Sequence, residues 1–73
     1  MSYTTQVVVY ERNGWKLTSY GRGAAYLLEC GGKRVFLQGD DADIFRGEVM
    51  EDDGFLRDSC EERFADYSGV MEG

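Results

Sequence analysis

Acidic side chains are the residues of this sequence whose types and spacing could do chemistry, and the first acidic run extends from Asp40 to Asp43. A calcium-binding loop begins with such a run, because Ca²⁺ takes oxygen ligands from alternate positions. Counted from Asp41, Asp43 stands at the third position, as that loop requires. The fifth position, however, is Phe45, and the sixth, where the loop needs glycine, is Arg46. The spacing argues against a calcium site and indicates instead the capped start of a helix.

A carboxylate pair for general acid–base catalysis could come from five acids in the same half of the chain: Glu48, Glu51, Asp52, Asp53 and Asp58. Catalytic carboxylates need a pocket that shifts their pKa, whereas these lie among many like charges on an expected solvent-facing surface. A nucleophile of the Cys–His or Ser–His–Asp type is excluded within the chain, because it contains no histidine. We predict that the protein is not an enzyme and needs no cofactor. An enzyme subunit completed only in an oligomer is a further alternative.

The two cysteines do not match a metal site. Cys30 and Cys60 are 30 positions apart, and neither belongs to a CxxC motif. A disulfide between them and two buried thiols both remain open, and a cytosolic setting favours the thiols. We expect a cytoplasmic protein, because residues 1–5 lack the pattern of a signal peptide. No apolar run approaches the roughly 20 residues of a membrane span.

Two short motifs could contact phosphates or bases, and both have a structural explanation. The segment Gly21-Arg22-Gly23 lacks the GxxxxGK[ST] spacing of a phosphate-binding loop, so its glycines indicate a turn or a bulge. Trp15 near Arg12 could stack on bases, but such a pair more often forms a local cation–π contact. Direct binding to nucleic acid is not expected, since a net charge of −6 would repel phosphates.

The strongest functional signal is a division of charge at Gly39-Asp40. Residues 1–39 contain five basic and two acidic side chains, a net charge of +3. Residues 40–73 contain three basic and twelve acidic side chains, a net charge of −9. Such an excess can serve solubility alone. Neighbouring acids repel one another and cost stability, however, so in a domain this small the excess favours a surface for a basic partner.

The basic half predicts a sheet, because its apolar residues occur in short β-branched and aromatic runs. The predicted strands are residues 6–12, 15–20, 25–30 and 33–38. Asn13-Gly14 joins the first two and Gly31-Gly32 joins the last two. Both dipeptides tolerate the positive φ of a two-residue type I′ turn. We therefore predict a four-stranded antiparallel meander.

Two-residue turns also fix the register of each hairpin. In the first hairpin the predicted pairs are Arg12 with Trp15, Glu11 with Lys16, Tyr10 with Leu17, and Val9 with Thr18. In the second they are Glu29 with Arg34, Leu28 with Val35, Leu27 with Phe36, and Tyr26 with Leu37. Each hairpin thus has an opposite-charge pair one step from its turn, and we predict a Glu11–Lys16 ion pair across the strands, which supports the register.

This register predicts two apolar faces for one sheet. In the first hairpin one face holds Val8, Tyr10, Trp15 and Leu17, and the other holds Val7, Val9 and Tyr20. In the second hairpin Leu27 and Phe36 point away from the other apolar residues. Two short helices can cover only one face. Unless the sheet curls on itself, the second face is an exposed apolar patch that favours an interface.

The acidic half predicts two helices. The first covers about residues 41–52, with Asp40-Asp41 as its cap and with Ile44, Phe45 and Val49 on one face. The second carries an apolar stripe that consists of Leu56, Cys60, Phe64 and Tyr67 and ends at Ser68-Gly69. Residues 70–73 are expected to fray.

The sequence therefore predicts one α+β domain over residues 1–73. An antiparallel sheet of about four strands, built from two hairpins (5–38), is followed by one or two acidic amphipathic helices packed on one face (40–69) and by a tail (70–73). The charge pattern predicts a set of partner-binding acids: Asp40, Asp41, Asp43, Glu48, Glu51, Asp52, Asp53, Asp58, Glu61, Glu62 and Asp66.

In size, charge, absence of motifs and compact α+β pattern, the chain resembles the small acidic inhibitors encoded by phages and mobile elements. Anti-CRISPR proteins and other DNA mimics are their main examples. The resemblance is one of general character over the whole chain, so no residue role can be carried over. It implies stoichiometric blocking of a basic, nucleic-acid-binding protein such as a CRISPR effector, in the host cytoplasm. Lys and Arg side chains spaced for phosphates accept carboxylates too.

An alternative assigns the interface to the sheet instead of the acids. The chain would then be a small structural or regulatory phage or bacterial module that forms a homodimer through its second apolar sheet face. In that case the acids would serve only solubility. Clustering of the acids on one surface would favour the first interpretation, and scattering would favour the second.

Overall fold

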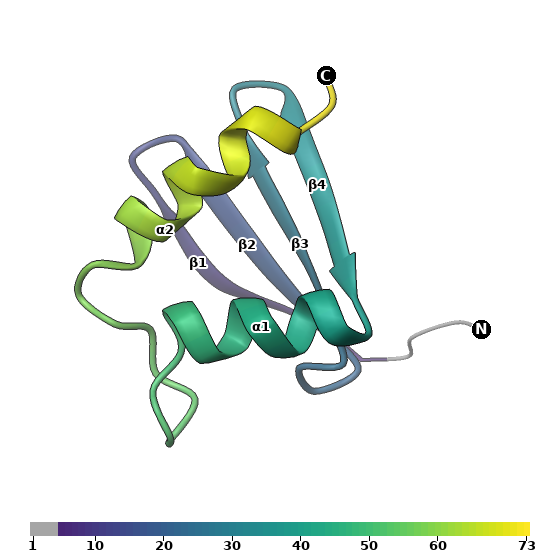
Figure 1. Cartoon of the computed structure of the whole chain (residues 1–73), viewed down its shortest axis with the longest axis vertical. Helices are drawn as coiled ribbons and strands as arrows, with labels where there is room; N and C mark the ends of the chain where they lie inside the picture. The colour runs from purple at the N-terminus through teal and green to yellow at the C-terminus, as the bar shows by residue number, and fades with distance from the viewer. Residues whose placement is uncertain (1–4) are drawn as a thin grey trace.

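The structure, a computed structural model, describes residues 5–73, which fold as a four-stranded sheet followed by two helices (Figure 1). The strands β1 (Gln6–Arg12), β2 (Trp15–Tyr20), β3 (Ala25–Cys30) and β4 (Lys33–Gln38) form one open antiparallel sheet in the order β1-β2-β3-β4. The helices are α1 (Asp40–Val49) and α2 (Cys60–Tyr67), and a 3₁₀ turn, η1 (Ser68–Val70), continues α2. The predicted α+β fold class is confirmed. No helix in residues 5–73 has the length and apolarity needed to cross a bilayer.

Both hairpins have the two-residue turns that the sequence predicts. Asn13 and Gly14 have φ values of 53° and 83°, and Gly31 and Gly32 have φ values of 57° and 86°. Two successive positive φ values define a type I′ turn, whose twist matches that of the flanking strands. The predicted charged pairs lie directly opposite each other on neighbouring strands: Glu11 with Lys16, and Glu29 with Arg34.

The register of the first hairpin departs from the prediction at Val9. Tyr10 pairs with Leu17 as expected, but Thr18 pairs with Val8, so β1 contains one extra residue. The predicted Val9–Thr18 pair is therefore wrong. Because paired residues point to the same face, Val8 joins Thr18 on the face opposite to Leu17. Such a bulge is typical of an edge strand, because no hydrogen-bonded strand on its outer side fixes its register.

The turn between the hairpins requires glycine at position 23. Gly21, Arg22 and Gly23 have φ values of 61°, 59° and 94°. Gly23 is also buried, and a Cβ atom there would lie 3.1 Å from the hydroxyl oxygen of Tyr26. Arg46 of α1 occupies the remaining space and donates a hydrogen bond of 2.6 Å to the carbonyl oxygen of Gly23. The turn therefore also joins the sheet to α1.

The first helix starts one residue earlier and ends three residues earlier than predicted. Met50 is already extended, with φ −109° and ψ 144°, and it pairs with Leu56 in a short antiparallel bridge. The buried side chains of the helix are Ala42, Phe45 and Val49. Ile44 is 57% exposed, so its predicted place on the buried face is wrong. Adjacent helical residues are about 100° apart, which places Ile44 outside the stripe that Phe45 defines.

The predicted cap of α1 is also corrected. The residue before the helix is Gly39, which has no side chain to act as a cap. Asp40 and Asp41 lie inside the first turn, together with Asp43. There their charges favour the helix through its dipole instead of through a cap hydrogen bond.

The second helix begins at Cys60, four residues after the start of the apolar stripe. Gly54, with φ 84°, turns the chain back so that Leu56 pairs with Met50 before the helix starts. The apolar stripe predicts a buried Leu56, but this residue is only partly buried against the core. The stripe is confirmed at Phe64, which is 0% exposed.

Both helices lie on the same face of the sheet (Figure 1), and aromatic rings join the two layers. Phe45 of α1 stacks on Phe64 of α2, with 6.1 Å between ring centroids and 9° between ring planes. Phe64 contacts Trp15 at 5.5 Å, and Phe45 contacts Tyr26 at 5.4 Å. Such ring pairs stabilise by about 0.5–1.5 kcal/mol beyond their burial. The small core thus depends on aromatic pairs between the layers.

The C-terminal segment, which the sequence predicts to fray, is anchored to the edge of β4. The backbone N–H of Arg34 donates to the carbonyl of Glu72 at 2.9 Å, and the Glu72 N–H donates to the Arg34 carbonyl at 2.8 Å. Met71 is buried against the core. These two hydrogen bonds and one buried side chain correct the prediction.

Both cysteines are free thiols. Cys60 is buried and Cys30 is half-buried. Burial raises the pKa of the Cys60 thiol above its ordinary value, because a low-dielectric surrounding disfavours the thiolate. The sequence left a disulfide open as an alternative, and the structure contains none between them.

Candidate functional site

The division of charge along the sequence is also a division between layers. β4 ends at Gln38 and α1 begins at Asp40, so the boundary of charge coincides with the step from the sheet to the helices. The helices and the loop between them lie on one side of the sheet (Figure 1). All twelve acids of residues 40–73 therefore belong to the helical layer or to the segment that follows it.

One predicted partner-binding acid has an intramolecular role. Glu61, at the start of α2, accepts a hydrogen bond from the hydroxyl of Tyr10 and contacts the side-chain amide of Asn13 at 3.1 Å. The hydrogen bond with Glu61 raises the pKa of Tyr10 to about 12 and lowers the pKa of Glu61 below its ordinary value. Glu61 thus joins α2 to the first hairpin, across 51 positions of sequence.

Three more of the predicted acids contact other side chains of the helices: Asp43 with Arg46, Glu48 with the Tyr67 hydroxyl at 3.4 Å, and Asp66 with Arg63 at 3.6 Å. Burial raises the pKa of Tyr67, and the contact with Glu48 raises it further. The ion pairs with arginine at Asp43 and Asp66, and the hydrogen bond from the Tyr67 hydroxyl at Glu48, leave these carboxylates less available to an outside partner. Such exposed contacts contribute little stability, about 0–1 kcal/mol each.

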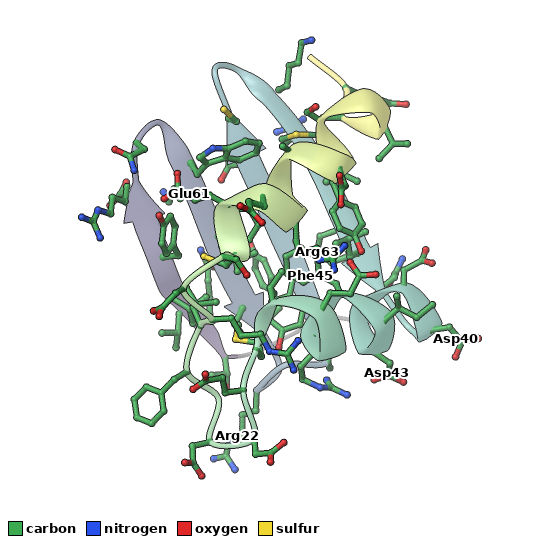
Figure 2. The ribbon with its side chains drawn as sticks, turned by 60° about the vertical axis from the view of Figure 1, so that its left-hand side comes forward. Arg22, Asp40, Asp43, Phe45, Glu61 and Arg63 are labelled. Carbon is green, nitrogen blue, oxygen red and sulfur yellow. The ribbon has the colours of Figure 1, made fainter. Side chains whose placement is uncertain are left out.

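The other seven predicted acids are exposed, and their side chains form no hydrogen bond or ion pair with another described residue. We call them the acidic surface: Asp40, Asp41, Glu51, Asp52, Asp53, Asp58 and Glu62. They occupy three places on the helical layer, namely the start of α1, the loop between the helices, and the approach to and first turn of α2. Figure 2 shows that the start of α1, marked by Asp40 and Asp43, lies far from Glu61 at the start of α2. The acids therefore share a layer without forming one compact patch.

The densest part of the acidic surface is the loop that follows α1. An open hollow of about 380 Å³ is lined by Glu51, Asp52, Asp53 and Arg57. The Arg57 guanidinium is directed to the backbone, where it donates to the carbonyl of Glu48 at 3.2 Å. Three carboxylates thus face one cation that is already hydrogen-bonded. Within residues 5–73, no three acidic or cysteine side chains are grouped in a way that could hold a metal ion.

The face of the sheet that the helices leave uncovered forms a second candidate surface, which we call the open sheet face. One row across its four strands is charged and consists of Glu11, Lys16, Glu29 and Arg34. The next row consists of Val8, Thr18, Leu27 and Phe36. Val8 is 46% exposed and Phe36 is 44% exposed. The predicted uncovered face with Leu27 and Phe36 is therefore present, but the bulge places Val8 on it and moves the predicted Val7, which pairs with Ser19, to the other face.

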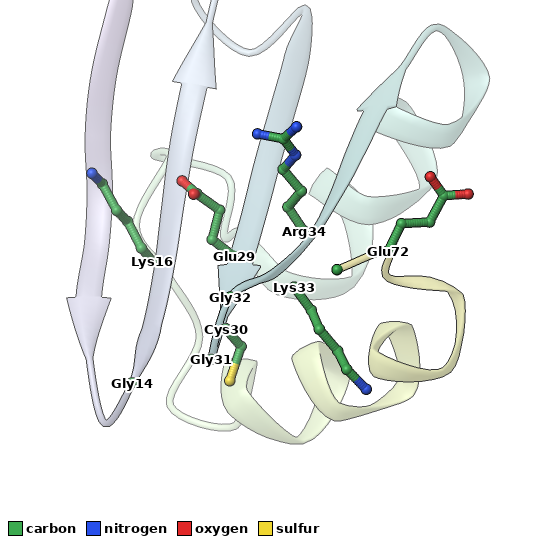
Figure 3. Close-up of a pocket in the computed structure, with 10 residues that line it drawn as sticks. Gly14, Lys16, Glu29, Cys30, Gly31, Gly32, Lys33, Arg34 and Glu72 are labelled. Carbon is green, nitrogen blue, oxygen red and sulfur yellow. The ribbon is translucent and has the colours of Figure 1, made fainter.

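The charged row lies beside a shallow hollow at the turn end of the sheet. This hollow, of about 300 Å³, is lined by residues of β2, β3 and β4 and by the C-terminal segment. Figure 3 shows Lys16, Glu29 and Arg34 projecting from three neighbouring strands, while Lys33 points toward α2. The predicted Glu11–Lys16 pair is aligned by the register, yet no ion pair within 4.0 Å involves the charged row in the described part of the chain.

Sequence reasoning could not tell the four engaged acids from the seven free ones. Tyr10 and Glu61 belong to different halves of the chain, and no local pattern connects them. The one usable signal was helical spacing, since Asp43–Arg46 and Arg63–Asp66 are both three residues apart and such pairs are neighbours on a helix.

Comparison of the chain with protein-family models, with curated proteins and with solved structures finds no match.

Proposed function

We propose that this chain is a non-enzymatic acidic protein that binds a basic, nucleic-acid-binding protein and blocks its groove. The observation that supports this most strongly is the acidic surface itself. Seven exposed carboxylates have no partner within the described chain, and all of them belong to one layer. In solution such charges repel one another, and a partner rich in Lys and Arg would relieve that repulsion.

The separation of charge between the layers supports a defined orientation on such a partner. The sheet layer carries most of the basic side chains, whereas the helical layer carries the acidic excess. A positive groove would therefore attract the helical layer and not the sheet. Long-range attraction of this kind raises the rate of association and weakens as salt screens it beyond about 8–10 Å.

The resemblance to small phage-encoded inhibitors narrows the class of partner. A CRISPR effector grips nucleic acid with Lys and Arg side chains in a positive channel. Carboxylates on a compact domain can occupy such a channel, because guanidinium and ammonium groups bind them as they bind phosphates. Under this proposal the protein acts in the host cytoplasm as an anti-CRISPR inhibitor or a related DNA mimic.

The experiment is a pull-down with the tagged protein from host lysates that contain a CRISPR or restriction system, followed by competition with DNA for the captured protein. Asp52→Lys/Asp53→Lys reverses two charges of the acidic surface. An exposed ion pair contributes about 0.2–1 kcal/mol, and each reversal replaces that attraction by a repulsion of similar size. Over two positions the effect is about 0.8–4 kcal/mol, so we expect affinity to fall about 4-fold to 1,000-fold. Affinity should also fall steeply between low and physiological salt.

The matched control is Asp66→Lys/Glu72→Lys, which changes the net charge by the same amount at exposed positions outside both the acidic surface and the four-strand charged row. It should bind nearly as well as the wild type, because the acidic surface is unchanged. Equal losses in both variants would show that only net charge matters. An affinity that ignores salt and the Asp52/Asp53 reversal would refute the proposal.

A further inference from the structure

We infer that the open sheet face is the interface of a two-fold symmetric homodimer of this chain. The inference is independent of the proposed function, because it concerns the sheet layer and not the acidic surface. It rests on the order of charges across the four strands. From β1 to β4 the charged row consists of Glu11, Lys16, Glu29 and Arg34, so negative and positive side chains alternate across the sheet.

This order is self-complementary under one particular two-fold axis. If the axis runs along the strands between β2 and β3, β1 of one protomer lies over β4 of its partner, and β2 lies over β3. Glu11 then faces Arg34 of the partner subunit, and Lys16 faces Glu29 of the partner subunit. The two-fold axis repeats each of these contacts, so the row forms four contacts between subunits, and every one joins opposite charges. The same four residues in another order would not have both properties. Two acids followed by two bases, for example, would still face opposite charges on the partner subunit, but like charges would be neighbours within each sheet.

The second row fits the same axis. Val8 would face Phe36 of the partner subunit. Thr18 is only 2% exposed and Leu27 is half-buried, so the contact surface of this row lies at its outer positions. Val8 and Phe36 remain 46% and 44% exposed in the protomer, so both retain surface that a second copy can cover. An axis perpendicular to the strands would instead place the charged row over the far end of the sheet. There the register positions hold Gln6, Tyr20, Ala25 and Gln38, which contain no charge to match it.

The twist of packed sheets decides which contact is the most informative. Aligned sheets pack about 10 Å apart and are rotated by about 30°. With strands about 4.8 Å apart, β2 and β3 lie about 2.4 Å from the axis and β1 and β4 about 7 Å from it. Rotation therefore displaces the central pairs by about 1 Å and the outer pairs by about 4 Å. The Lys16–Glu29 contact between subunits should survive this rotation, and it is the one to test.

The size of the face indicates a weak, reversible dimer. Four strands of about six residues give a footprint of about 19 by 20 Å on each protomer. That footprint is about 380 Å² per protomer, or about 760 Å² in total, which is below the roughly 1,200 Å² at which stable specific interfaces begin, so the dimer belongs to the weak, transient class. In such a dimer the two helical layers would lie on opposite outer sides. Each dimer would then present two acidic surfaces that point away from each other.

The test uses charge reversals that separate contacts between subunits from contacts within one. Lys16→Glu makes both central positions acidic, and Glu29→Lys makes both basic, so each variant should repel its own copy and dimerise at least 10-fold more weakly than the wild type. An equimolar mixture of the two variants, however, restores opposite charges at both central contacts. The mixture should therefore form a heterodimer, although each protomer still carries its unfavourable pair within the chain.

Sedimentation velocity and light scattering over a range of concentrations measure the association, with 8.3 kDa expected for the monomer and twice that mass for the dimer. Far-UV circular dichroism checks that each variant is folded. The matched control is Lys33→Glu, a reversal on the same strand end whose side chain points toward α2 (Figure 3), and it should dimerise like the wild type.

Three results would overturn the inference. The wild type could remain a monomer at millimolar concentration, which would mean that something other than a second copy covers the face. Lys16→Glu and Glu29→Lys could each dimerise as the wild type does, which would place the interface elsewhere. The mixture of the two variants could stay monomeric while both are folded, which would show that the reversals act only within the protomer.

Discussion

Replacing Phe64 by alanine removes the side chain on which both helices and the sheet converge. Phe64 is 0% exposed, and its ring contacts Phe45 at 6.1 Å, Trp15 at 5.5 Å and Tyr10 at 5.4 Å. Loss of a buried phenylalanine costs about 3–5 kcal/mol, because the transfer energy is lost and a cavity remains. The whole stability of a domain of 73 residues is about 4–11 kcal/mol. The substitution should therefore remove about a quarter or more of the free energy of unfolding.

For a domain of this size each kcal/mol corresponds to about 4–8 °C in melting temperature, so Phe64→Ala should lower Tm by about 12–40 °C. Thermal and urea unfolding, followed by circular dichroism and by the fluorescence of Trp15, measure the change. Phe55→Ala is the matched control, because Phe55 is 68% exposed and its loss should change stability by no more than about 0.5 kcal/mol. If Phe64→Ala melted within a few degrees of the wild type, the stacked aromatic core would be refuted.

Three further predictions concern one hydrogen bond and two glycines. The pKa of Tyr10 is raised from 10.0 to about 12, so the unfolded chain ionises first and wild-type stability should fall as pH rises from about 10 to about 12. Tyr10→Phe should lose less stability over that interval than the wild type in urea titrations, and coincident profiles would show that the bond to Glu61 is absent in solution. Gly47→Ala in α1 should raise stability by up to about 1 kcal/mol, because no atom lies within 4 Å of the added Cβ and alanine favours a helix. Gly23→Ala should lower stability by about 1 kcal/mol or more, since φ is +94° and the Cβ would press on Tyr26, and a neutral effect would contradict that geometry.

The turns show which features a local sequence determines. Asn13-Gly14 and Gly31-Gly32 adopt the predicted geometry because positive φ at two successive positions is a property of those residues themselves. The charged pairs next to each turn follow at once, since a two-residue loop leaves only one register. The turn does not determine the pairing of Val9, which lies four residues before it. There the packing of Tyr10 on Phe64 helps to fix where the strand resumes its pairing.

The helices show the limit of periodicity. The stripe at Cys60, Phe64 and Tyr67 is helical as predicted, but Leu56, which continues the same spacing, lies before the helix. Spacing alone cannot show where a helix starts, because a residue in a turn can reach the core as well as a residue on a helical face. The bridge between Met50 and Leu56 decides this, and it depends on Gly54 and on the packing of both helices.

The sequence by itself determined the order of the elements, the turns, most of the register and the division of charge at Gly39, because each depends on neighbouring residues or on simple counting. Only the tertiary structure decided which acids are free. Glu61 is engaged because folding brings Tyr10, 51 positions away, within hydrogen-bond distance. It also decided that both helices cover one face and leave the other open, since that choice depends on how two short helices fill the space over four strands. Both candidate surfaces follow from that long-range packing, which no local pattern encodes.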